Sequence, residues 1–146
     1  PGLFYKSRRP ETVVSTAQLD KTNTTLSDVA GLSVNINTGK KYAIRGLLNT
    51  NLSAGGLGKF TLTGTATASA VWFACVNNAA GGVTGSVINT SLASTISFGA
   101  SGDNVLDYYG VIACNGTGTL KVQFAQASAS GTSSVRVNST LQVIGI

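Results

Sequence analysis

Apolar and polar residues alternate along most of this 146-residue chain, and this pattern limits the fold more than any other feature. In residues 32–36, leucine, valine and isoleucine alternate with serine and asparagine, and similar alternation runs through 41–49 and 119–124. Successive side chains of a β-strand point to opposite faces of its sheet, so alternation indicates strands with one buried face. No helical period of useful length is present. The sequence therefore predicts an all-β protein.

Clusters of glycine, asparagine and serine separate the alternating segments. The clearest cluster is Asn115-Gly116-Thr117-Gly118. An Asn-Gly pair between two alternating runs is typical of a tight β-hairpin, because glycine and asparagine tolerate positive φ. We therefore predict a hairpin here, with Leu120, Val122 and Phe124 lying across from the strand 105–114. A second turn is expected at 37–40, with Gly39 in the positive-φ position.

About eight to ten short strands separated by turns are typical of a sandwich, jelly roll or barrel. We predict an antiparallel, jelly-roll-like β-sandwich with an extended N-terminal arm. The arm comprises residues 1–12 and a single sandwich domain comprises 13–146, since no internal repeat or second domain is visible. Candidate segments for these strands lie at 12–18, 24–29, 32–36, 41–49, 59–63, 68–76, 83–88, 95–98, 105–114, 119–124 and 135–143.

Several residues are assigned to the core or to the surface by this pattern. The strand 68–76 alternates less than the others, which favours a central position with Trp72 packed in the core. Tyr108 and Tyr109 are adjacent, so they must point to opposite faces and one of them is expected to be exposed. Cys75 and Cys114 fall inside predicted strands, and we expect two free, buried thiols because a reducing compartment disfavours a disulfide.

The composition argues against an enzyme. The chain has no histidine, the side chain that most readily carries protons near neutral pH. It has only five carboxylates, namely Glu11, Asp20, Asp28, Asp103 and Asp107. Asp103 and Asp107 are the only close pair, and the Gly-Asp-Asn context of Asp103 favours a turn with an Asx-type bond. We predict no catalytic residue, no metal site and no cofactor, since two cysteines supply only half a zinc shell.

Charged residues make up 10% of the chain, far below the usual quarter. A chain of this size ordinarily needs charge to keep its surface from associating with others. The low charge therefore favours a surface that is partly covered by copies of the chain or by a partner. The alternative is a surface solvated by hydroxyl and amide groups.

The arm carries the candidate binding residues. Phe4 and Tyr5 stand directly before Lys6, Arg8 and Arg9. Aromatic residues beside cations are enriched at protein interfaces, and cations can meet an acidic partner surface. We therefore predict that the arm holds a partner, although it could also fray or pack on its own domain. Three cations are too few to indicate nucleic acid. The chain shows neither a signal-peptide pattern nor an apolar run long enough for a membrane span, so no membrane partner is expected.

Two regions of the chain resemble small β-domain proteins of tailed bacteriophages. The first runs from Thr24-Thr25-Leu26-Ser27-Asp28-Val29-Ala30-Gly31-Leu32 through Gly39-Lys40-Lys41-Tyr42-Ala43-Ile44-Arg45-Gly46. The second comprises Gly110-Val111-Ile112, Gly116-Thr117-Gly118-Thr119-Leu120-Lys121-Val122-Gln123-Phe124 and a final valine-rich strand. The resemblance spans residues 13–146 and implies a virion structural protein with a jelly-roll-like sandwich that often forms trimers.

Among virion roles, a capsid decoration (cement) protein fits a short single-domain chain with a basic, aromatic arm. The resemblance then implies a homotrimer that is synthesised in the host cytoplasm and binds the major capsid protein shell on the outer capsid surface. One alternative is the receptor- or carbohydrate-binding head of a tail or head fibre. Another is a small jelly-roll coat protein that encloses nucleic acid.

Overall fold

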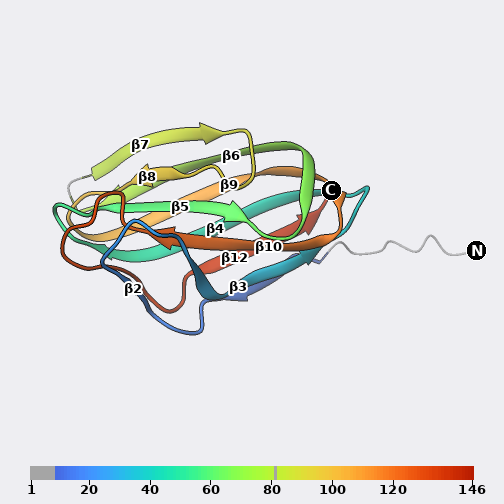
Figure 1. Ribbon diagram of the computed structural model, residues 1–146. Helices are drawn as coiled ribbons and strands as arrows, with labels where there is room; N and C mark the ends of the chain where they lie inside the picture. Colours follow the sequence, from blue (N-terminus) through green and yellow to red (C-terminus); the bar gives the residue numbers. More distant parts are fainter. Residues whose placement is uncertain (1–8, 81) are drawn as a thin grey trace, which may run out of the picture.

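The computed structural model describes residues 9–80 and 82–146, with the backbone alone for 83–89. Within these ranges the secondary structure is twelve β-strands and no helix, which confirms the all-β prediction. Figure 1 shows the arrangement of these strands. The strands are β1 Glu11–Val14, β2 Leu19–Lys21, β3 Ser27–Ile36, β4 Lys41–Leu52, β5 Gly58–Thr63, β6 Thr67–Ala79, β7 Gly82–Asn89, β8 Ile96–Phe98, β9 Gly102–Gly116, β10 Gly118–Ala125, β11 Ser133–Val135 and β12 Thr140–Gly145.

The described strands form two antiparallel sheets that pack as a sandwich, as predicted. The larger sheet has the order β1-β12-β4-β9-β6-β7, and β11 joins it by pairing with both β4 and β2. The smaller sheet has the order β3-β10-β5-β8. From β3 to β6 the chain alternates between the two sheets, because β3 and β5 belong to the smaller sheet and β4 and β6 belong to the larger one. Strands that are neighbours in sequence therefore face each other across the core.

The predicted hairpin at 115–118 is wrong. β9 pairs with β4 and β6 in the larger sheet, whereas β10 pairs with β3 and β5 in the smaller one. The register shows the two different pairings, since Gly116 lies opposite Thr67 of β6 and Gly118 lies opposite Ile36 of β3. Neither glycine has positive φ. The Asn-Gly segment therefore carries the chain from one sheet to the other, because both strands bury their apolar faces against the opposite sheet.

The N-terminal strands also differ from the prediction. β1 begins at Glu11, inside the segment assigned to the arm, and ends at Val14 instead of residue 18. The two expected strands at 24–29 and 32–36 are one strand, β3, which passes through Gly31. Gly31 has a φ of 89°, and a Cβ atom there would lie 2.5 Å from the Val14 carbonyl oxygen. The glycine is required because β3 passes very close to the end of β1. The turn at 37–40 is confirmed, with Gly39 at a φ of 79°.

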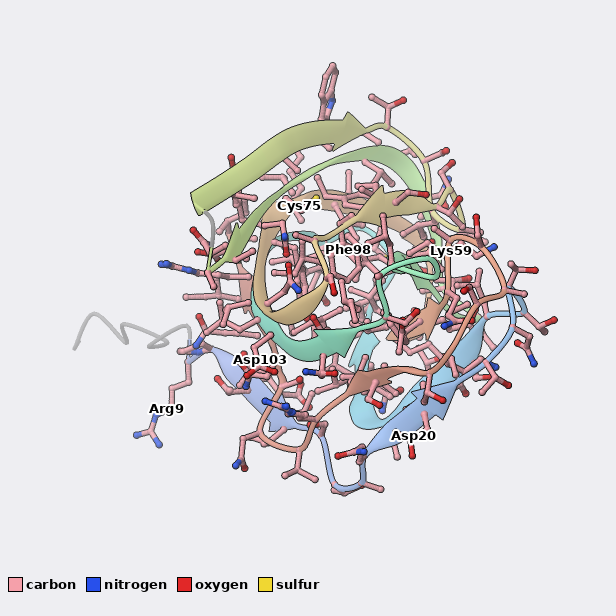
Figure 2. All side chains as sticks on the ribbon, turned by 90° about the vertical axis from the view of Figure 1, so that its left-hand side faces the viewer. Arg9, Asp20, Lys59, Cys75, Phe98 and Asp103 are labelled. Atoms are coloured by element: carbon pink, nitrogen blue, oxygen red, sulfur yellow. The ribbon has the colours of Figure 1, made fainter. Side chains whose placement is uncertain are left out.

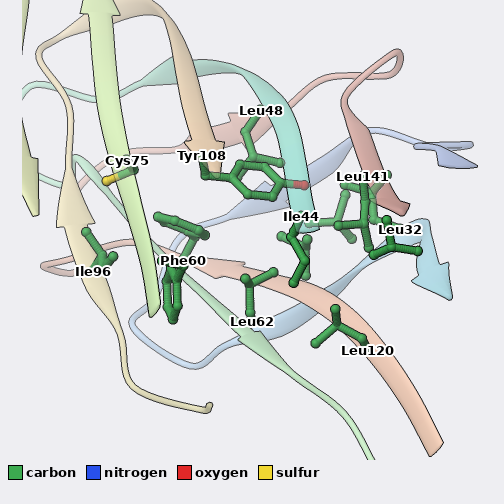
Figure 3. Close-up of a cluster of buried hydrophobic side chains, with 14 of the residues drawn as sticks. Leu32, Ile44, Leu48, Phe60, Leu62, Cys75, Ile96, Tyr108, Leu120 and Leu141 are labelled. Carbon is green, nitrogen blue, oxygen red and sulfur yellow. The ribbon is translucent and has the colours of Figure 1, made fainter. Parts of the chain in front are cut away.

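The core lies between the two sheets and is built from the apolar half of each alternating strand. Figure 3 shows part of it, including Phe60 and Leu62 of β5 facing Tyr108 and Leu48 of the larger sheet. The rings of Phe60 and Tyr108 have centroids 5.6 Å apart. Packed aromatic pairs of this kind stabilise a core beyond their buried area.

Tyr108 connects three strands of the larger sheet. It is fully buried on β9, and its hydroxyl donates a 2.6 Å hydrogen bond to the Thr140 carbonyl oxygen of β12. The ring crosses the intervening strand β4 at Gly46, where a Cβ atom would lie 2.2 Å from both Cζ and Oη of the tyrosine. Only glycine leaves room for this crossing. The buried hydroxyl is satisfied because β4 has no side chain at that position.

Both cysteines are buried and neither forms a disulfide, as predicted. Cys75 lies opposite Tyr108 in the β6–β9 pair, whereas Cys114 belongs to β9 six positions further along. At about 3.4 Å per residue their Cα atoms are on the order of 20 Å apart along the sheet. A disulfide requires Cα atoms within about 7 Å, so the separation forbids this bond in the folded chain.

A buried glutamine organises the loop before β11. Gln126 is fully buried and its amide nitrogen donates to the Ser130 carbonyl oxygen at 2.8 Å, while its amide oxygen accepts from the Ser130 backbone at 3.2 Å. The same amide nitrogen lies 3.3 Å from the Ser133 hydroxyl. Gly56 packs directly on this amide, since a Cβ atom at Gly56 would lie 2.3 Å from it. The Gln126 side chain is therefore one of the contacts that close the loop 127–132 on the body, beside the hydrogen bond from the Ser53 hydroxyl to the Ser130 carbonyl oxygen.

Candidate contact surface

The residues predicted to hold a partner lie mostly outside the described part of the chain. Phe4, Tyr5, Lys6 and Arg8 belong to residues 1–8, which the structure does not describe. Arg9 is described, is exposed, and projects away from the body of the molecule in Figure 2. Arg9 has no hydrogen bond or ion pair with any described residue. It stands two residues before β1, so the arm joins the molecule at the edge of the larger sheet.

The solvent-facing side of the larger sheet is a second candidate surface, which we call the outer face. It is formed by the strand residues that alternate with the buried ones, and none of them is fully buried. The outer face comprises Thr12 and Val14 of β1, Thr140, Gln142 and Ile144 of β12, Ala43, Arg45, Leu47 and Asn49 of β4, Val105, Asp107, Tyr109 and Val111 of β9, and Trp72, Ala74, Val76 and Asn78 of β6. Most of these side chains are apolar.

Strand register arranges the outer face in rows. One row runs Ile144, Ala43, Val111 and Trp72 across β12, β4, β9 and β6. The next runs Gln142, Arg45, Tyr109 and Ala74, and the third runs Thr140, Leu47, Asp107 and Val76. A shallow hollow lies between the first two rows on β12, β4 and β9. Apolar side chains thus form a continuous band across four neighbouring strands.

Trp72 was predicted in the core, and this prediction is wrong. Its side chain is 62% exposed on the outer face. β6 alternates after all, since Val71, Phe73 and Cys75 point inward. Within the described residues only β7 lies beyond β6 in the larger sheet. The small apolar residues around Trp72 hid the alternation, because alanine carries little information about which side of a strand is buried.

The two adjacent tyrosines point to opposite faces, as predicted. Tyr108 is fully buried, whereas Tyr109 is 49% exposed on the outer face beside Val111, which is 42% exposed. Tyr108 is therefore unable to stack on any ligand. Of the aromatic residues singled out in the sequence, Trp72 and Tyr109 are the two that the outer face presents.

The outer face carries two opposite charges near its centre. Arg45 lies opposite Tyr109, and Asp107 lies opposite Leu47, so the two charged residues sit on adjacent strands one row apart. No ion pair or hydrogen bond joins either of them to another described residue. The Oδ1 atom of Asp107 is buried and has no hydrogen-bond donor within the described part of the chain. The alternation in 41–49 puts Arg45 on the polar side of its strand, but its neighbours come from β9 and β12 and are not visible in that pattern.

A groove lined by both polar and apolar residues lies at one end of the outer face. Asn49, Val105 and Asn78 line it together with Asp103 and Arg136. Asp103 accepts a 2.6 Å hydrogen bond from the Asn51 amide and forms a 2.8 Å ion pair with Arg136. The hydrogen bond from Asn51, followed by the positive charge of Arg136, lowers the pKa of Asp103. The charge of Asp103 is therefore compensated within the chain by Asn51 and Arg136, so these groups stabilise the end of the sheet.

Asp103 does not make the Asx-type bond that was predicted for it. The turn is closed instead by the neighbouring Asn104, whose side chain donates to the Ala100 and Gly102 carbonyl oxygens and accepts from the Ala100 backbone. Asp103 begins the exposed side of β9. Among the described residues no three of the types His, Cys, Asp and Glu come together in a group that could hold a metal ion. The same part of the chain contains no helix of the length and hydropathy needed to span a membrane.

Comparison with known proteins finds only distant structural likeness. No protein-family model matches the chain. No curated protein matches its sequence. Among solved structures, the fold is similar to one of infectious bursal disease virus, Gx strain, at 15% identity and a TM-score of 0.28 over 99% of this chain and 44% of that one. It is also similar to the VP2 subviral particle of the same virus, at 12% identity and a TM-score of 0.28, over 97% and 42% of the two chains. This chain spans less than half the length of either, and these values assign it to no family.

Proposed function

We propose that this protein is a non-enzymatic virion structural protein of the capsid decoration type, which binds and stabilises the head shell of a tailed bacteriophage as a homotrimer. The observation that carries the proposal is the outer face, where Trp72, Tyr109 and Val111 expose apolar surface across adjacent strands. Exposed apolar bands of this extent mark surfaces that other molecules cover. The complete absence of histidine in the chain adds support, since it removes the commonest acid–base catalyst.

The arm supplies the contact with the shell in this proposal. Phe4 and Tyr5 would bury apolar area on a shell subunit, and Lys6, Arg8 and Arg9 would meet acidic groups there. The resemblance of residues 13–146 to small β-domain proteins of tailed phages supports a role in the virion. The short single domain with its basic, aromatic arm favours the shell as the partner. The protein would then lie on the outer surface of the capsid, after synthesis in the host cytoplasm.

Deletion of residues 1–10 tests this proposal. The truncated chain keeps β1 complete from Glu11, so its thermal unfolding should resemble that of the full chain. Cosedimentation with shells lacking the protein should show full-chain binding and loss of binding by the truncated chain. A matched control replaces Lys40, in the turn before β4, and Lys41, the first residue of β4, with serine. Binding of the truncated chain at full strength would refute the role of the arm, and failure of the full chain to bind shells would refute the decoration function.

A carbohydrate-binding head is the second candidate function. The observation in its favour is the exposed ring of Tyr109, which lies beside Arg45 on the outer face. Aromatic rings with a polar neighbour can stack on sugar rings. A glycan array would support this function if it gave hits that Tyr109→Ala abolishes and Tyr109→Phe preserves. An array without such hits would contradict the carbohydrate-binding function.

A further inference from the structure

We infer that the outer face is the self-association surface of this protein, and that Arg45 of one copy meets Asp107 of the next copy across it. The inference deepens the proposed function by naming the surface of its oligomer, and it rests on that function only for the expectation that copies associate. A second copy of this chain is the occupant to which we commit.

The first argument is the size and continuity of the apolar band. Trp72 and Val111 lie directly opposite each other on β6 and β9, and Tyr109 lies two residues from Val111 on the same side of β9. Their exposed fractions are 62%, 42% and 49%. Aromatic residues of this kind are enriched in interfaces and dominate the binding energy when they are desolvated near the centre. The band therefore has the composition of an interface core.

The second argument is the state of Asp107. Its Oδ1 atom is shielded from solvent but receives no hydrogen bond from the described residues. A buried carboxylate oxygen without a donor is unfavourable, because desolvation is not repaid by a hydrogen bond. The other oxygen of this carboxylate, Oδ2, is not among the buried atoms, so an arginine of a second copy can reach Asp107 there and compensate its charge.

The third argument identifies the source of that arginine. Arg45 stands on the adjacent strand, one row from Asp107, and makes no ion pair within the described part of the chain. A face that carries one free cation and one free carboxylate within an apolar band is complementary to a copy of itself. A partner whose surface carried only positive or only negative charge would oppose a like charge at either Arg45 or Asp107, and like charges are unfavourable at an interface. Closed symmetric assembly then lets every copy satisfy both charges.

Charge reversal in the full-length chain tests the inference. Analytical ultracentrifugation of the purified wild type, with no shell present, should show an oligomer. Arg45→Asp should weaken association by roughly 100-fold or more, because like charges then oppose each other across the interface. Asp107→Arg should do the same, and the double variant Arg45→Asp/Asp107→Arg should restore association. Lys59→Asp, a reversal on β5 in the smaller sheet, is the matched control and should leave the oligomer intact.

Trp72 provides an independent readout, because it is the single tryptophan of the chain. Its emission should lie at shorter wavelength and resist acrylamide quenching in the oligomer, and both properties should be lost in Arg45→Asp. Circular dichroism verifies that each variant is folded, and Arg45→Asp carries the test if Asp107→Arg does not fold. A wild type that is monomeric at every concentration would overturn the inference. So would an oligomer that keeps Trp72 fully quenchable and is unaffected by Arg45→Asp. Neither result depends on shell binding, so the decoration function is tested separately.

Discussion

At the scale of single residues, the larger sheet depends on a tyrosine that reaches across a glycine. Tyr108 of β9 bonds to the Thr140 carbonyl of β12 over Gly46 of β4. Alternation along the sequence was sufficient to predict that Tyr108 and Tyr109 face opposite sides. It could not predict which of them is buried, because that depends on the strands that pair with β9. The requirement for glycine at 46 likewise comes from residues far away in the sequence.

Replacing Gly46 with alanine should destabilise the protein. The added Cβ atom would lie 2.2 Å from the Tyr108 ring and 2.3 Å from the Thr140 carbonyl oxygen, so the tyrosine has to move and its hydrogen bond weakens. We expect the free energy of unfolding to fall by about 1–3 kcal/mol, the usual cost of overpacking. Urea unfolding measures this. Gly145→Ala is the control, since nothing lies within 4 Å of a Cβ atom there, and an equal loss in both variants would contradict the explanation.

Stability should also fall at alkaline pH because of Tyr108. Burial raises the pKa of its hydroxyl far above the ordinary value, so the folded protein retains the proton. The unfolded chain releases that proton above pH of about 10, and the unfolded state therefore gains stability as the pH rises further. Urea unfolding between pH 8 and 11.5 should show this decline, approaching about 1.4 kcal/mol per pH unit from this one group. Tyr108→Phe should give a shallower decline than the wild type, whereas Tyr109→Phe should not. Equal slopes in wild type and Tyr108→Phe would argue against this role.

At the scale of elements, strands were predictable but their connections were not. The alternation in 41–49 and 119–124 identified β4 and β10, because a half-buried strand imposes a period of two on its own sequence. The Asn-Gly segment at 115–118 was misread as a hairpin, because a turn signal does not reveal which strands pair on either side of it. β9 and β10 each find better partners in different sheets, and tertiary packing overrides the local preference.

The stability of the loop 127–132 should depend on the buried side chain of Gln126. Its side chain satisfies the backbone of Ser130 and contacts the Ser133 hydroxyl in a site closed from solvent. Gln126→Ala leaves the Ser130 backbone N–H without its acceptor in a buried site, while the Ser130 carbonyl keeps its bond from the Ser53 hydroxyl. We expect a loss of about 1–3 kcal/mol of stability. Hydrogen exchange should accelerate at 127–132 before it does so elsewhere. Gln18→Ala removes an exposed glutamine that bonds only to Asp20 and should have little effect. Unchanged exchange in Gln126→Ala would show that the loop is held by other contacts.

At the scale of the whole molecule, one core between two sheets protects both thiols. Cys75 and Cys114 are buried in separate parts of this core. A thiol reagent should therefore react only when the molecule opens, with a rate that follows the stability to unfolding. Reaction with Ellman's reagent should be slow in buffer and should reach two thiols per chain in denaturant. Prompt reaction of one thiol in the native protein would reveal a local opening, and fewer than two thiols in denaturant would reveal a disulfide.

Local sequence pattern was enough to establish the β class, many of the strands, the burial of the two cysteines and the opposed tyrosines. Each of these follows from which side of its own strand a residue occupies. The pairing of β9 and β10 with different sheets, the exposure of Trp72 and the outer face itself needed the folded chain. These features join residues more than thirty positions apart, such as Trp72 with Val111 and Arg45 with Asp107. A period of two records which residues share a side of one strand, but it carries no information about which strand lies next to it.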